Sequence, residues 1–124
     1  MPSTILVVDD EPAIRDLVSV LLEDAGYTVC SAPDGLAAME TVARESPDLV
    51  VTDLYMPGLD GLGLIAWLRR EWPHLPIVVL SAALRVSPPA GVPFVPKPLD
   101  VQTLLAVIAG IVDGQQHGDA NEPR

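Results

Sequence analysis

Short apolar runs alternate with amphipathic segments along most of this chain, and this alternation constrains the fold more than any other feature. Five runs have the length and composition of buried strands, and turns or helix-like segments follow them. The predicted strands are 4–8, 27–30, 49–52, 77–80 and 93–95. Strands that alternate with helices indicate parallel pairing, with helices on both faces of one sheet. The sequence therefore predicts an α/β fold, a doubly wound (βα)5 parallel sheet.

Four segments have the apolar spacing or the capping residues of helices. Pro12 suits the first turn of the first one, and Gly26 ends it as glycine commonly ends helices. Asp34 and Asp100 are placed to cap two others at their amino ends. The predicted helices are 12–25, 34–44, 62–72 and 100–112.

Two regions depart from this regular alternation. Between the fourth and fifth predicted strands, Pro88, Pro89 and Pro93 are incompatible with a helix interior, so we expect the fourth helix of the fold to be shortened or absent. Residues 114–124 are polar and lack periodicity, which predicts a disordered tail. The remaining residues, 1–113, are expected to form one domain.

Composition and charge argue against several classes of protein. Seventeen acidic and seven basic residues give a net charge of −10, which argues against nucleic acid as a direct partner, because such binding relies on Lys and Arg at phosphates. No apolar stretch approaches the roughly 20 residues of a membrane span, and no signal peptide is expected. The single cysteine, Cys30, cannot form an internal disulfide and fits a reducing compartment. We therefore expect a cytoplasmic protein that binds neither nucleic acid nor membrane.

Three carboxylates follow predicted strands directly. Asp9 and Asp10 come after the first strand, and Asp53 comes after the third. If these strands are neighbours, the carboxylates converge at the carboxyl edge of the sheet, where ligands bind in such folds. Like charges repel, so this pocket favours a hard cation, and Mg²⁺ needs only one or two carboxylates and some water. Alternatively, Asp9 and Asp10 cap the first helix and favour its amino-terminal dipole, and the two roles are compatible.

Two further polar residues are predicted at the same edge. Ser81 ends the fourth strand, and Lys97 ends the fifth. A lysine over a carboxylate cluster can neutralise it or bind a phosphate, and a serine hydroxyl can donate to that phosphate. Taken singly, each has an ordinary alternative, since surface lysines are usually solvated and serines often cap helices.

The order of these residues resembles that of receiver domains of bacterial two-component response regulators. The resemblance covers residues 4 to about 112. It is carried by Val8-Asp9-Asp10-Glu11, by Asp53 with the turn Met56-Pro57-Gly58-Leu59-Asp60-Gly61, by Ser81-Ala82 and by Lys97-Pro98. It implies a flavodoxin-like sheet with strand order 2-1-3-4-5, in a stand-alone receiver of the chemotaxis-regulator type.

The resemblance implies a phosphoacceptor and a metal site. Asp53 would take a phosphoryl group from a histidine kinase or a histidine phosphotransfer protein. Asp10, Asp53 and the backbone carbonyl of Tyr55 would ligate Mg²⁺ directly, and Asp9 would act through water.

The resemblance also implies a switch that responds to the phosphoryl group. Ser81 and Lys97 would contact that group, and Phe94 would be the aromatic switch residue. Tyr55 and Ala83 occupy the two positions that tune phosphate lifetime in this family. Phe94 as an ordinary core residue is the alternative.

Three other functions are compatible with parts of this pattern, and each makes a different demand on the sequence. An interaction module that signals without phosphorylation would not need the full set of polar residues. A phosphatase resembling the haloacid dehalogenase group would carry an Asp where Tyr55 stands, and a dinucleotide enzyme would carry G-x-G-x-x-G after the first strand. The sequence does not name the downstream protein. We expect a monomer, or a weak homodimer that does not use the fourth-helix face.

Overall fold

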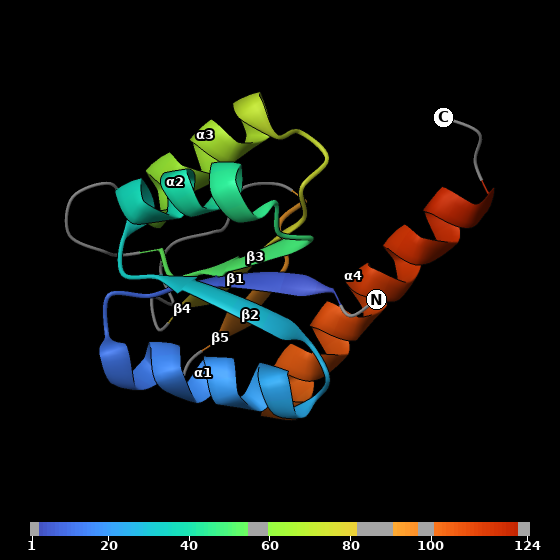
Figure 1. The fold of residues 1–124 in the computed structure, drawn as a ribbon, viewed down its shortest axis with the longest axis horizontal. Helices are drawn as coiled ribbons and strands as arrows, with labels where there is room; N and C mark the ends of the chain where they lie inside the picture. Colours follow the sequence, from blue (N-terminus) through green and yellow to red (C-terminus); the bar gives the residue numbers. More distant parts are fainter. Residues whose placement is uncertain (1–2, 55–59, 82–90, 97–100, 122–124) are drawn as a thin grey trace.

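Five parallel strands form one sheet at the centre of the molecule (Figure 1). The computed structural model describes residues 3–54, 60–81, 91–96 and 101–121 of the chain. The strands are β1 (Thr4–Val8), β2 (Thr28–Ala32), β3 (Leu49–Thr52), β4 (Ile77–Ser81) and β5 (Phe94–Pro96). They lie in the order β2-β1-β3-β4-β5, and every neighbouring pair is parallel. The predicted α/β class and strand order are confirmed.

Helices cover both faces of this sheet. They are α1 (Pro12–Asp24), α2 (Gly35–Glu45), α3 (Gly61–Glu71) and α4 (Val101–Asn121). In Figure 1, α2 and α3 lie on one face, and α1 lies on the other with the first turns of α4. The described fold is therefore doubly wound.

Alternate residues of β1 supply two separate apolar cores. Leu6 and Val8 belong to a core that α2 and α3 cover, whereas Ile5 and Val7 belong to one that α1 and α4 cover. All four side chains are at most 2% exposed. A strand buried on both faces reads as a continuous apolar run, which explains why the strands are visible in the sequence.

The helix ends follow the predicted chemistry where the structure describes them. The Asp34 carboxylate accepts a hydrogen bond from the Ala37 N–H at 2.8 Å, as expected of an amino-terminal cap. Gly26 follows α1 with φ 102°, a conformation that side chains rarely adopt. The sequence analysis missed a third device, Asp60, whose carboxylate accepts from the Gly63 N–H at 2.9 Å and caps α3.

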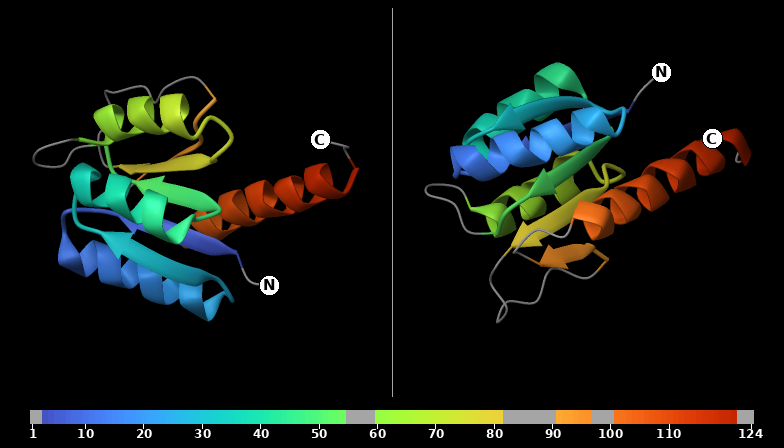
Figure 2. Two further views of the ribbon diagram at one scale, coloured as in Figure 1. Left: turned by 45° about the horizontal axis from the view of Figure 1, so that its top comes forward. Right: turned by 90° about the horizontal axis from the view of Figure 1, so that it is seen from below.

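The last helix is longer than predicted. It was expected to end near Val112, but α4 continues to Asn121. The glycine in its path, Gly114, does not adopt the positive φ that ends α1, and a Cβ there would meet nothing within 4 Å. Figure 2 shows the end of α4 running beyond the sheet. The disorder of residues 114–124 and the domain boundary at 113 stay predictions.

The sequence predicts that the helix between β4 and β5 is shortened or absent. That segment includes residues 82–90, which lie outside the described residues, so this stays a prediction. Within the described ranges, no helix combines the length and the apolar character needed to cross a membrane.

Candidate functional site

The pairing of β1 with β3 brings the predicted carboxylates together. Val8 and Thr52, the last residues of the two strands, are partners in the parallel register. The Asp53 N–H donates to the Val8 carbonyl at 3.1 Å, and this bond extends the pairing by one residue. Asp9 and Asp53 therefore emerge side by side at the carboxyl edge, as the sequence analysis expected of neighbouring strands.

Asp9, Asp10 and Asp53 form one acidic cluster. One carboxylate oxygen from each lies within 4.8 Å of the others. Asp9 is 2% exposed and Asp53 is 8% exposed, whereas Asp10 is more open to solvent. Because Mg²⁺ binds oxygen at about 2.0–2.1 Å, ligands on opposite sides of an octahedron lie about 4.2 Å apart. The cluster is thus only slightly wider than a magnesium site, and its oxygen donors are the type that a hard cation prefers.

Asp53 is held by its own neighbours in the chain. The Leu54 N–H donates to Asp53 Oδ1 at 2.7 Å, in a buried environment. The Thr52 hydroxyl donates to the Asp53 main-chain carbonyl at 2.9 Å. These bonds restrict both the carboxylate and the backbone that carries it, which favours a fixed position for a reacting group.

Asp9 is held by the residue that precedes α1 and by a side chain of α1. Its Oδ1 accepts a hydrogen bond from the Glu11 N–H at 3.0 Å, and Glu11 is the residue before the helix. This bond reaches the residue before α1 and not a helical N–H, so the capping role of Asp9 stays a prediction. Arg15 donates from Nη1 to the Asp9 carbonyl at 2.7 Å, a contact that the sequence analysis missed. The one sequence feature that could have suggested this contact is a basic residue, Arg15, about one helical turn after Glu11.

The other predicted site residues are described in part or not at all. Ser81 ends β4 and Phe94 begins β5, so their backbones belong to the sheet, but their side chains are not described. Tyr55, Ala83 and Lys97 lie outside the described residues. The metal, phosphate-binding, switch and lifetime-tuning roles of these five residues stay predictions.

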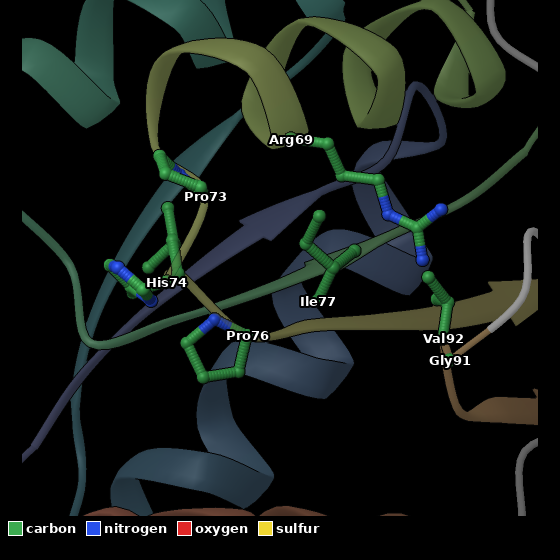
Figure 3. A pocket seen from close by; sticks show the side chains of 8 residues that line it. Arg69, Pro73, His74, Pro76, Ile77, Gly91 and Val92 are labelled. Atoms are coloured by element: carbon green, nitrogen blue, oxygen red, sulfur yellow. The ribbon is translucent and has the colours of Figure 1, made fainter.

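A separate hollow lies at the opposite edge of the sheet (Figure 3). It has a volume of about 320 Å³ and lies between the end of α3, the start of β4 and the residues just before β5. Its lining residues are Arg69, Pro73, His74, Leu75, Pro76, Ile77, Gly91 and Val92. None of these carries a carboxylate, and the acidic cluster is at the other ends of the strands. The cavity is therefore not the metal site.

A flavodoxin-like sheet with three carboxylates after β1 and β3 belongs to the class of open α/β domains that bind ligands at the carboxyl edge, and these oxygen donors suit a hard cation. The family model described as the response regulator receiver domain matches residues 5–109. The chain belongs to this family. It is accordingly a signalling phosphoacceptor rather than a classical enzyme, and its family implies a cognate histidine kinase.

Curated relatives and solved structures agree with this assignment. The chain is 41% identical over 124 residues to response regulator MprA of Mycobacterium leprae (strain TN), an alignment that covers 95% of this chain and 54% of that protein. The chain spans about half the length of the first curated relatives it matches.

Two solved structures are similar over nearly the whole domain. Chemotaxis protein CheY4 of Vibrio cholerae has a TM-score of 0.81 at 28% identity, covering 90% of this chain and 99% of that chain. A putative response regulator from Chloroflexus aurantiacus J-10-fl has a TM-score of 0.84 at 30% identity, covering 91% and 99%.

Proposed function

We propose that this receiver accepts a phosphoryl group on Asp53 from a histidine kinase or a histidine phosphotransfer protein, with Mg²⁺ as the cofactor. The observation that carries the proposal is the position of Asp53. Its carboxylate is nearly buried at the end of β3, within 4.8 Å of carboxylate oxygens of Asp9 and Asp10. Buried charges in proteins are paired or coordinate a metal ion, and a hard cation would balance the like charges of this cluster.

The reaction is a transfer between two protein side chains. A carboxylate oxygen of Asp53 attacks the phosphorus of a phosphohistidine, the phosphorus–nitrogen bond breaks, and the imidazole leaves with its electron pair and takes up a proton. Asp53 becomes an acyl phosphate. Leu54 and Thr52 hold Asp53 in place through the bonds at 2.7 Å and 2.9 Å.

The metal ligands are the acidic cluster and one carbonyl. Asp10, Asp53 and the backbone carbonyl of Tyr55 would hold Mg²⁺, with Asp9 acting through water. When bound, the ion neutralises the charge of the phosphoryl oxygens during transfer.

The phosphoryl group then changes the charge at the edge of the sheet. It adds about −1.5 to −2 units of charge and several acceptor oxygens. Ser81 and Lys97 would contact these oxygens, and Phe94 would turn inward as the loop after β4 moves. Tyr55 and Ala83 would tune how long the phosphate lasts.

The helix that follows the acidic cluster offers a surface for the phosphodonor. Two apolar side chains of α1, Leu17 and Val20, are 46% and 61% exposed. Because α1 starts at Pro12, two residues after Asp10, a donor domain that covers this helix brings its phosphohistidine close to Asp53. The downstream partner is a protein rather than nucleic acid. Any self-association is weak and avoids the face that a helix between β4 and β5 would form in this fold. Cytoplasmic placement remains an expectation.

Phosphorylation by a small donor tests the proposal. Acetyl phosphate with Mg²⁺ should add one phosphoryl group to the wild-type chain, measured as intact mass, and none to Asp53→Asn. The Asn side chain keeps the Oδ1 acceptor for the Leu54 N–H, so this variant should fold. Equal labelling of the variant would show that the acceptor is another residue.

A further inference from the structure

Gly61, the first residue of α3, lies directly on the main chain of Asp53. A Cβ added to it would be 2.8 Å from the Asp53 carbonyl carbon and 2.6 Å from the Leu54 Cα, and closer still to the Asp53 carbonyl oxygen. Real Cβ atoms essentially never approach other atoms this closely. The obstructing atoms are all backbone, so rotation of a side chain cannot relieve the contact.

The need for glycine here is one of space and not of backbone conformation. Gly61 does not adopt a positive φ, unlike Gly26 at 102° and Gly91 at 81°. An alanine would therefore be allowed by the backbone, and it is the better helix former. The close approach to Asp53 is the remaining reason for a glycine.

Gly61 also closes the loop that follows the phosphoacceptor. Its N–H donates to the Leu54 carbonyl at 2.8 Å. This bond joins the residue after Asp53 to the first residue of α3. In sequence, Tyr55 is the first residue inside that loop. A displacement of Gly61 acts on both ends of the loop and on Asp53 itself.

We propose that Gly61 is a positioning residue of the phosphorylation site, because its bare Cα lets α3 pack against the Asp53 main chain and sets the Asp53 carboxylate at its distance from Asp9 and Asp10. The proposal rests on the proposed function and deepens it. The Thr52 hydroxyl donates to the same carbonyl oxygen at 2.9 Å. A side chain at position 61 pushes this carbonyl, and the acidic cluster then binds a cation less tightly.

The test is a Mg²⁺ titration of Gly61→Ala, followed by amide chemical shifts, together with the rate of labelling by acetyl phosphate. We expect the Mg²⁺ affinity to fall about 10- to 100-fold, the range seen when a group that orients a metal ligand is removed. Gly110→Ala is the matched control, since a Cβ there meets nothing within 4 Å, and it should leave the affinity unchanged.

A second control separates positioning from stability. Leu68 is fully buried near the far end of α3, so Leu68→Ala should lower the melting temperature while it leaves Mg²⁺ affinity at the wild-type value. A Gly61→Ala variant that melts earlier but binds Mg²⁺ and accepts phosphate like the wild type would overturn the proposal.

Thr52→Val keeps the test decisive if Gly61→Ala does not fold. It preserves the shape of the buried side chain and removes only the donor to the Asp53 carbonyl. We expect a smaller fall in Mg²⁺ affinity, and an unchanged affinity would contradict the proposed hold on this carbonyl. Failure of the proposed function itself would look different, because the wild-type chain would then not be labelled, or Asp53→Asn would be labelled equally.

Discussion

Replacing Asp10 with asparagine should stabilise the metal-free protein. Asp10 has its carboxylate within 4.8 Å of those of Asp9 and Asp53. Two unit charges at that distance repel by about 3.5 kcal/mol at an effective dielectric constant of 20 and by about 0.9 kcal/mol in bulk water. Because Asp10 is more open to solvent than its two nearly buried partners, the lower figure sets a lower bound, and removing its two repulsions should raise the free energy of unfolding by at least about 1–2 kcal/mol.

Urea unfolding at low ionic strength, with and without Mg²⁺, measures this effect. A ligand that binds only the folded state adds stability, so Mg²⁺ should raise the urea midpoint of the wild type. In chelator, the midpoint of Asp10→Asn should exceed that of the wild type, and Mg²⁺ should raise it much less. Asp9→Asn should lose less of the response to Mg²⁺, since Asp9 is expected to act through water.

Glu40→Gln provides the control for net charge. Glu40 is exposed on α2 and does not belong to the acidic cluster, so its replacement changes the charge equally without relieving the repulsion. If Asp10→Asn were no more stable than the wild type in chelator, or kept the full response to Mg²⁺, the reasoning about the cluster would be wrong.

Three further outcomes are expected. Leu104→Ala, which empties a fully buried position of α4, should cost about 2–5 kcal/mol in urea unfolding, and a loss below 1 kcal/mol would show that α4 is not firmly packed. Burial raises the pKa of the Cys30 thiol. Alkylation at mildly alkaline pH should be slower in the folded than in the urea-unfolded chain, and equal rates would contradict it. The raised pKa favours the folded state below the thiol's ordinary pKa, and this contribution is lost as the pH rises above it. Val20→Glu should impair transfer from the cognate kinase but not labelling by acetyl phosphate, and loss of both would indicate a folding defect.

The site carboxylates were predictable because their positions depend on features that the sequence displays directly. The runs before Asp9 and Asp53 are apolar without interruption, as expected of strands buried on both faces. Only one further assumption, that β1 and β3 are neighbours, was needed to bring the carboxylates together, and the strand pairing confirms it.

Contacts that depend on how helices are placed on the sheet were not predictable. Gly61 was quoted as part of a turn, but its approach to Asp53 depends on the placement of α3. The bond from Arg15 to the Asp9 carbonyl likewise requires the position of α1. The error at the end of α4 has another cause, since Gly114 and the polar residues after Val112 predict a helix end, whereas local propensity is only a weak guide to where a helix stops.

The central claim is that Asp53 is the phosphoacceptor, and locating the acyl phosphate in the chain tests it most directly. Borohydride reduction converts a phosphorylated aspartate to homoserine, and peptide mass spectrometry then identifies the position. After treatment with acetyl phosphate and Mg²⁺, we expect homoserine at position 53 and unmodified aspartate at positions 9 and 10. Homoserine at Asp9 or Asp10, or none at Asp53 despite a phosphorylated intact mass, would contradict the account.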